Sequence, residues 1–188
     1  MVVRLILSIG IMLIMLFLFK SHYGYYFRES EAIRKTAPHL NGPVVFEKSE
    51  NNGKVVITKG ASGSHALFIK KKWKVFHRTA SATAIMTPMD SEESIKRTCL
   101  ASKSSSQTYD ILFAVEVSDP AIKKVIVTED NIDQLSAKEV TEVKSKSNFF
   151  LEMDVEHGYA ATCREMDLMV GFAFRGVDEK GNIKIVGR

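Results

Sequence analysis

The stretch Ile111-Leu-Phe-Ala-Val-Glu-Val117 is apolar at six of its seven positions. A short, nearly continuous apolar run bounded by turn residues is typical of a strand that is buried on both faces or that crosses the core of a sandwich. Asp119-Pro120 follows it and indicates a turn, after which residues 122–128 predict another strand. The sequence therefore predicts a central strand here, with β structure on either side.

Strand patterns continue in both directions from this run. Residues 44–47 and 55–58 predict a hairpin in which Asn52-Gly53 supplies the positive φ angles of a tight turn. Residues 66–69 and 73–77 flank a basic run, and predict either one long bent strand or two strands joined by a basic turn. Alternation of apolar and polar residues predicts half-buried strands at 148–155 and 168–174, and a last strand at 183–186.

Helical signals are few beyond the N-terminal region. Asp90-Ser-Glu-Glu93 has the spacing of a capping box, so residues 95–100 are expected to complete one or two helical turns. Ser102 to Thr108 is expected to form a polar surface loop. About eight predicted strands with so little helix argue for a mainly β fold, an antiparallel sandwich or open barrel with one or two short helices.

The N-terminal segment from Leu5 to Phe19 contains fifteen residues without a charge. Residues 1–3 can extend it because the long stem of Arg4 can snorkel, and eighteen or nineteen helical residues span roughly 27 Å. Residues 23–27 are mostly aromatic, which suits the headgroup region, and no small-x-small cleavage pattern is visible. Residues 1–20 are therefore predicted to be an uncleaved transmembrane signal-anchor, with a cleaved signal and a freely secreted domain as the alternative.

The rest of the chain divides into a juxtamembrane spacer at residues 21–43, with a short helix starting at Ser30, and a β-rich domain at residues 44–188. A literal count of flanking basic residues favours an internal C-terminus, whereas the signal-anchor form favours translocation of the long segment that follows. We expect a single-pass protein of the cell membrane whose domain is extracytoplasmic.

Charge is concentrated near the N-terminus. The chain of 188 residues has 26 basic and 22 acidic side chains, of which residues 1–43 contain five basic and two acidic ones. Residues 44–188 are therefore close to neutral and lack the basic surface that binding to a phosphate backbone usually needs. We expect no nucleic-acid partner.

Three segments together resemble a known pattern: residues 113–127 with Asp119-Pro120, Asn148-Phe-Phe-Leu, and residues 174–183 with Asp178-Glu-Lys-Gly181. The pattern is similar to that of uncharacterised small membrane-anchored or secreted β-rich proteins of Gram-positive bacteria, over about residues 113–188. The resemblance implies a β-rich extracytoplasmic domain. It carries no catalytic residues that could be transferred to this chain.

The most suggestive local cluster is Lys70, Lys71, Lys72, Trp73 and Lys74. Four ammonium groups around an indole suit contact with anionic lipid headgroups or with wall-polymer phosphates. The alternative is a core tryptophan flanked by solvated lysines on a strand edge, where lysines discourage aggregation.

The two cysteines, Cys99 and Cys163, form either a disulfide, which would contribute about 4 kcal/mol for so long a loop, or two free thiols. His65, His77 and His157 fit no metal-binding spacing, so no metal and no cofactor is expected.

The sequence thus favours a non-catalytic, membrane-anchored interaction or binding module, whose partner is an envelope protein, an anionic lipid or a wall polymer. The alternative is a cell-envelope enzyme such as a hydrolase, which would need a pocket that brings together Asp154, Glu156 and His157 with distant strands.

Overall fold

The structure is a computed structural model of the chain and describes residues 2–36, 38–40, 42–86, 94–129, 139–167 and 171–187. Within these residues the fold is mainly β, and the strands pair in antiparallel fashion in three sheets. The expectation of a mainly β, antiparallel fold is confirmed. The capping box at residues 90–93 lies outside the described residues, and so do the first three residues of the strand predicted at 168–174.

Sheet A is a meander of four strands in the order β1-β2-β3-β4. Its strands are β1 (Val44–Glu50), β2 (Gly53–Gly60), β3 (Gly63–Lys72) and β4 (Phe76–Ala84). The predicted first hairpin is confirmed, but its turn is Asn51-Asn52, because Glu50 pairs with Gly53. Gly53 is needed for another reason than a positive φ: an added Cβ would lie 2.1 Å from the carbonyl oxygen of Ile69 on β3.

Sheet B has the order β5-β6-β9, and sheet C has the order β11-β10-β7-β8. Sheet B contains β5 (Ile95–Lys103), β6 (Tyr109–Val117) and β9 (Tyr159–Met166). Sheet C contains β7 (Lys124–Glu129), β8 (Phe150–Asp154), β10 (Phe172–Val177) and β11 (Ile183–Gly187). The helical turns expected at residues 95–100 are wrong, because this segment pairs with β6 along its whole length.

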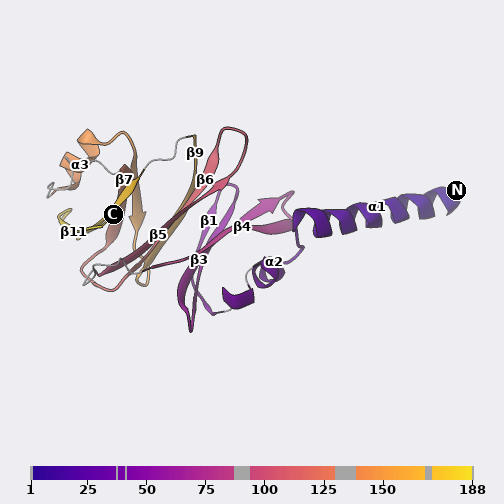
Figure 1. Cartoon of the computed structure of the whole chain (residues 1–188), viewed down its shortest axis with the longest axis horizontal. Helices are drawn as coiled ribbons and strands as arrows, with labels where there is room; N and C mark the ends of the chain where they lie inside the picture. Colours follow the sequence, from indigo (N-terminus) through magenta and orange to yellow (C-terminus); the bar gives the residue numbers. More distant parts are fainter. Residues whose placement is uncertain are drawn as a thin grey trace.

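The central strand β6 is buried on both faces, as its apolar sequence predicts. Phe113 faces sheet C and packs with Val127 and Phe174. Leu112 faces the other way and packs with Ile57 and Phe68 of sheet A. Sheet B therefore lies between sheets A and C, and Figure 1 shows sheet A on the side of the N-terminal helix and sheet C at the far end. A two-layer sandwich accounts for only part of this arrangement, because a third sheet covers the second face of β6.

The outer faces of the stack are covered by short helices. On sheet A lie α2 (Glu29–Thr36) and the 3-10 helix η1 (Pro38–Leu40); on the other side lies α3 (Val140–Lys146). Ala32 of α2 is fully buried, and Leu40 packs on Leu67 of β3. Thr58 also donates a hydrogen bond to the carbonyl of Leu40 at 3.2 Å, so α2 and η1 are packed on sheet A.

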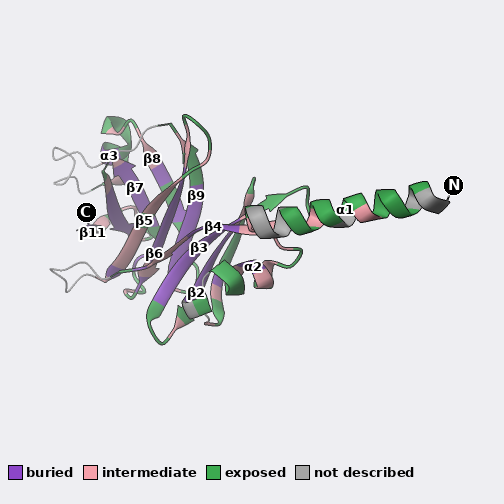
Figure 2. Ribbon diagram, turned by 45° about the vertical axis from the view of Figure 1, so that its right-hand side comes forward, coloured by how far each residue is buried: buried purple, intermediate pink, exposed green. Residues whose placement is uncertain are grey.

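The N-terminal helix α1 (Val2–Tyr23) projects away from the sheets (Figure 1), and most of its described residues are exposed (Figure 2). Within the part of the chain that the structure describes, no helix combines the length and the apolar character that crossing a membrane requires. Two backbone hydrogen bonds between Tyr26 and His77, of 2.8 and 2.7 Å, join the segment after α1 to β4.

Candidate functional site

The turn between β3 and β4 carries the basic and aromatic residues that the sequence singles out. Of the two alternatives for this region, the structure has two strands joined by a turn, which is closed by a 3.3 Å hydrogen bond from the amide of Val75 to the carbonyl of Lys72. Trp73 and Lys74 occupy its centre with φ angles of 50° and 63°. Two positive φ angles suit a hairpin turn in which Asn and Gly are the preferred residues. For Trp and Lys, this left-handed backbone costs about 1–2 kcal/mol per residue.

Trp73 lies at the surface, with 66% of its area exposed, so the alternative of a core tryptophan is wrong. Its indole makes an edge contact with the ring of Phe76, with centroids 6.0 Å apart. The Lys72 Nζ lies 5.1 Å from the centre of the same indole. The indole of Trp73 is therefore exposed to solvent and is contacted by Phe76 and Lys72 of the same hairpin.

The segment that follows α1 packs beside this turn. The ring of Phe27 lies 4.9 Å from that of Phe76. The ring of Tyr25 has two cationic neighbours, the Lys72 Nζ at 5.9 Å and the Arg78 guanidinium carbon at 5.3 Å. These contacts join residues that are about fifty positions apart into one surface. We call it the α1-exit surface and define it as Tyr25, Phe27, Lys71, Lys72, Trp73, Lys74, Val75 and Arg78.

Beyond α1, most of the large apolar side chains that are exposed in the described chain lie on the α1-exit surface. Phe27, Trp73 and Val75 expose 56%, 66% and 50% of their area. Outside α1 and the Tyr23 at its end, the only other large hydrophobic residues exposed in the described chain are Val44 and Met86. Three lysines at the end of β3 and in the turn, Lys71, Lys72 and Lys74, are exposed as well. The surface is both apolar and basic, as the sequence hypothesis requires.

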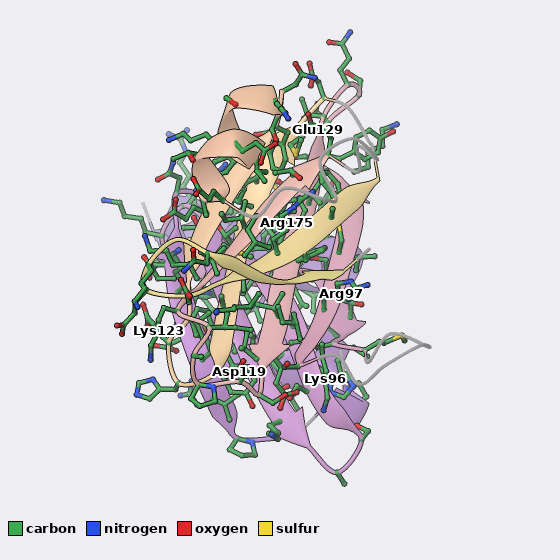
Figure 3. The ribbon with its side chains drawn as sticks, turned by 90° about the vertical axis from the view of Figure 1, so that its left-hand side faces the viewer. Lys96, Arg97, Asp119, Lys123, Glu129 and Arg175 are labelled. Carbon is green, nitrogen blue, oxygen red and sulfur yellow. The ribbon has the colours of Figure 1, made fainter. Side chains whose placement is uncertain are left out.

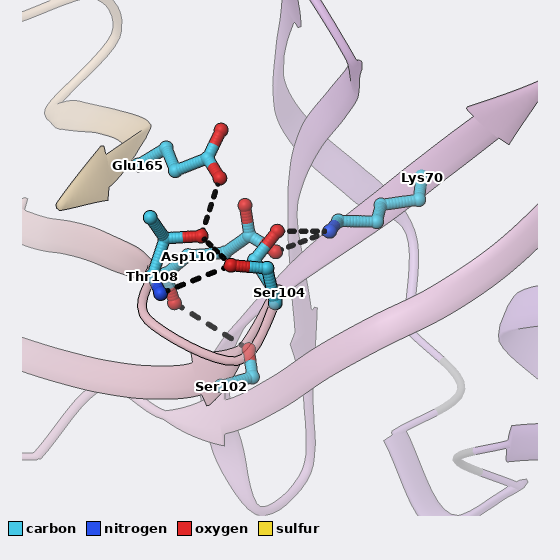
Figure 4. A network of polar contacts seen from close by, with 7 residues as sticks. Lys70, Ser102, Ser104, Thr108, Asp110 and Glu165 are labelled. Atoms are coloured by element: carbon cyan, nitrogen blue, oxygen red, sulfur yellow. Dashed lines mark hydrogen bonds and ion pairs between the residues drawn. The ribbon is translucent and has the colours of Figure 1, made fainter. Parts of the chain in front are cut away.

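Lys70 is separated from the other predicted residues. Its ammonium group forms an ion pair with Asp110 of β6 and donates a 3.0 Å hydrogen bond to Ser104 Oγ, as Figure 4 shows. Asp110 is only 4% exposed. The contacts continue from Thr108 Oγ1 to Glu165 at 2.6 Å. Lys70 therefore links sheets A and B at one end of their shared core, and is not part of the α1-exit surface.

A small pocket beside this ion pair is lined in part by Glu50, Asp110, Cys163 and Glu165. Burial raises the pKa of the Cys163 thiol to about 12, and the carboxylates of Asp110 and Glu50 add to the effect. A thiol with so high a pKa stays protonated at neutral pH and is a poor nucleophile. The carboxylate of Glu50 also accepts a 2.6 Å hydrogen bond from the hydroxyl of Thr162. The polar groups here hold strands together.

The two cysteines are both free, so the disulfide hypothesis is wrong. Cys99 on β5 pairs with Phe113, and Cys163 on β9 pairs with Leu112. The two cysteines therefore lie on opposite sides of β6 and on opposite faces of sheet B. Their strands are two spacings, about 10 Å, apart, whereas a disulfide needs Cα atoms within about 7 Å. Burial also raises the pKa of Cys99, to about 11.

The residues of the enzymatic alternative lie around the turn between β8 and β9. Asp154, Glu156 and His157 are all exposed. Asp154 Oδ1 is 4.0 Å from Lys124 Nζ, and the backbone of Glu156 pairs with that of Tyr159. Among the described residues, no group of three His, Cys, Asp or Glu side chains is suited to hold a metal ion.

A second polar cluster lies at the far end of the molecule, on the outer face of sheet C. Arg175 is fully buried and donates to Thr128 Oγ1 at 2.5 Å, and Figure 3 shows it below Glu129 on this face. Burial alone would raise the pKa of Glu129. The backbone amides of Asn148 and Phe149, which donate to its carboxylate at 2.6 and 2.8 Å, and the charge of Arg175 outweigh burial and lower that pKa. These contacts fix the chain around β7.

Comparisons with known protein families, curated proteins and solved structures found no match, so the site is interpreted from its own geometry. Sequence reasoning found the lysines and the tryptophan of the α1-exit surface but missed its Arg78 and the buried Phe76, whose ring contacts those of Trp73 and Phe27. Both lie on β4, and Arg78 lies over the ring of Tyr25. The pattern of apolar and polar residues in β4 does not indicate that its first residues contact the segment after α1.

Proposed function

We propose that this protein is a membrane-anchored, non-catalytic interaction module. In this proposal α1 is held in a membrane, and the β domain is carried on the extracytoplasmic side, where it binds a component of the cell envelope. The resemblance of residues 113–188 to small β-rich proteins of Gram-positive bacteria favours the same location.

The observation that carries the proposal is the contrast between α1 and the domain. Nine large apolar side chains of α1 are exposed: Ile6, Leu7, Ile9, Ile11, Met12, Ile14, Met15, Phe17 and Leu18. Soluble proteins rarely expose a continuous apolar area of this kind, because its contact with water is unfavourable. Insertion into lipid would remove that contact. The uncharged run from Leu5 to Phe19 supports the same assignment.

The extracytoplasmic side is supported by the form of the N-terminus. One arginine, Arg4, precedes the apolar run, and a long polar segment follows it. Basic residues after the run, including Lys20 and Arg28, favour the opposite orientation. The signal-anchor form prevails in the proposal, because the long segment after the run has almost no further apolar span and can be translocated whole.

An interaction role is favoured over an enzymatic one by what the polar side chains of the domain do. The buried carboxylate Asp110 is paired with Lys70, and the buried Arg175 bonds to Thr128. Both cysteines have pKa values raised well above neutral pH. These groups stabilise the fold, whereas the α1-exit surface leaves apolar and basic groups outward, as binding surfaces do.

The test uses a C-terminally tagged full chain in intact bacterial cells. We expect the tag to sediment with membranes, to resist extraction by high salt, and to be digested by protease added outside. The matched variant carries Ile11→Lys and Ile14→Lys, two exposed positions of α1 that leave the domain unchanged. Each lysine costs about 2.5–3.5 kcal/mol at the centre of a membrane helix, so this variant should be lost from the membrane fraction.

Two results would contradict parts of the proposal separately. A wild-type tag in the soluble fraction would overturn anchoring by α1. A membrane-bound tag that is protected until the cells are lysed would overturn the extracytoplasmic orientation and leave the anchor intact.

A further inference from the structure

We infer that the α1-exit surface docks on the anionic phospholipid headgroups of the membrane that holds α1. This inference rests on the proposed function and deepens it, because it names the partner of the same site. Docking would give the domain a defined face toward the membrane in addition to its tether.

The first argument is position. α1 ends at Tyr23, and the surface begins with Tyr25, two residues later. The backbone bridge between Tyr26 and His77 fixes β4 beside this point. When α1 is in a bilayer, the turn between β3 and β4 therefore lies at the level of the headgroups. A wall polymer can contact any face of the domain, whereas the α1-exit surface is held next to lipid.

The second argument is chemistry. Tryptophan and tyrosine are the side chains most enriched at membrane interfaces, where the ring is in the apolar region and its polar group is hydrated. Trp73 is the only tryptophan of the chain, and it is exposed on this surface. Ammonium groups beside it are attracted by anionic headgroups, with an effect of about fivefold in the binding constant for each lysine.

The first acidic residue of α2 has its ion-pair partner on β2. Glu29 forms its ion pair with Lys54 of β2, with the Nζ and Oε1 atoms 3.1 Å apart. Lys71, Lys72 and Lys74 are exposed. These exposed ammonium groups can therefore reach anionic groups outside the protein, while Lys72 also keeps its contacts with the rings of Tyr25 and Trp73.

The third argument is the strained turn. Trp73 and Lys74 both have left-handed backbone conformations, in which asparagine or glycine would be relaxed. Backbone strain of this kind is concentrated at functional sites. In this protein the strained turn places the exposed indole of Trp73 and the exposed ammonium group of Lys74 next to the end of α1.

The experiment measures the fluorescence of Trp73 in the full chain reconstituted in vesicles. With phosphatidylglycerol present, we expect a blue-shifted emission maximum and quenching by lipids brominated on their acyl chains, both reversed by high salt. With phosphatidylcholine alone, both effects should be much weaker. Equal quenching in the two lipids, or none in either, would overturn the inference.

A matched pair of variants tests the role of the lysines. The first changes Lys71, Lys72 and Lys74 to Gln and keeps the indole. The control changes Lys123, Lys144 and Lys180 to Gln, three exposed lysines that lie just before β7, on α3 and in the turn before β11. We expect the first variant to need about 100-fold more anionic lipid for half-maximal quenching, at about fivefold per lysine, and the control to behave as wild type. Equal behaviour of the two variants would overturn the inference.

Flotation of the same vesicles separates this inference from the proposed function. A protein that floats with vesicles but shows no lipid quenching has its anchor and lacks docking. A protein that does not float contradicts the anchor itself. If a soluble glycerol-phosphate polymer shifts the emission of Trp73 and anionic vesicles do not, the partner is a wall polymer, and the lipid assignment is overturned.

Discussion

Replacing Lys74 by glycine is expected to stabilise the protein, although glycine usually destabilises a folded chain. The φ angle of Lys74 is 63°, a conformation that costs about 1–2 kcal/mol for a residue with a Cβ. Glycine removes this cost and adds about 0.5–1 kcal/mol of conformational entropy to the unfolded chain. The net change is a stabilisation of about 0.5–1 kcal/mol, or a rise of about 2 °C in Tm for a chain of this size.

The matched control is Lys71→Gly, the same chemical change three residues earlier in the chain. Lys71 lies within β3, and its backbone amide bonds to the carbonyl of Asn52 at 3.1 Å, a contact that glycine keeps. Because glycine weakens a strand, this variant should lose about 0.5–1 kcal/mol. Urea unfolding of both variants in the same detergent gives the comparison. If Lys74→Gly is as destabilising as Lys71→Gly, the left-handed turn is refuted, and with it the argument from strain.

Four further predictions concern the domain. Phe113→Ala should lower stability by about 3–5 kcal/mol in urea unfolding, because the ring is fully buried and lies 4.9 Å from that of Phe172; a loss below about 1 kcal/mol would contradict the packing of sheet B on sheet C. Gly53→Ala should lower it by about 1–3 kcal/mol, since its Cβ would meet the carbonyl of Ile69, and Asn51→Ala in the adjacent turn is the control, expected to change little. The denatured, unreduced protein should take up two alkyl groups from iodoacetamide, one on each free cysteine, and a protein that takes up none has a disulfide. The carboxylate of Asp178 accepts hydrogen bonds from Asn182 and Lys180, which lower its pKa to about 2. The stability that the ionised carboxylate contributes is therefore present above pH 4 and is lost as the pH falls toward 2. Asp178→Asn should lower the urea midpoint at pH 7 and match wild type at pH 2.

The central strand could be predicted because its sequence is nearly all apolar. The same sequence does not say what covers each face of β6. Phe113 meets β7, β8 and β10, while Leu112 meets strands that lie more than forty residues earlier. The third layer was therefore not predictable from local patterns. A local capping signal predicts a helix at residues 95–100, but the segment belongs to strand β5, because nine consecutive residues pair with β6.

The candidate site could be predicted in part, for the same reason. The basic run and the tryptophan are visible as neighbours in the sequence. Lys70 does not belong to the α1-exit surface because it forms an ion pair with Asp110, forty positions later in the chain. The local sequence does not indicate this contact. The left-handed turn at Trp73 and Lys74 has neither Gly nor Asn to reveal it. The approach of Tyr25 and Phe27 depends on how the chain leaves α1.

Because the three sheets are stacked in the order A, B, C, a rotation of the domain at the end of α1 displaces sheet C most. Sheets in face-to-face contact are about 10 Å apart, so sheet C stands about 20 Å beyond sheet A, on the side away from α1 (Figure 1). A rotation of the domain by about 20°, the average tilt of a membrane helix, would swing sheet C sideways by about 7 Å. The same rotation would hardly move Trp73, which lies close to the pivot at Tyr26 and His77. A small rotation at the end of α1 would thus give a much larger displacement at sheet C.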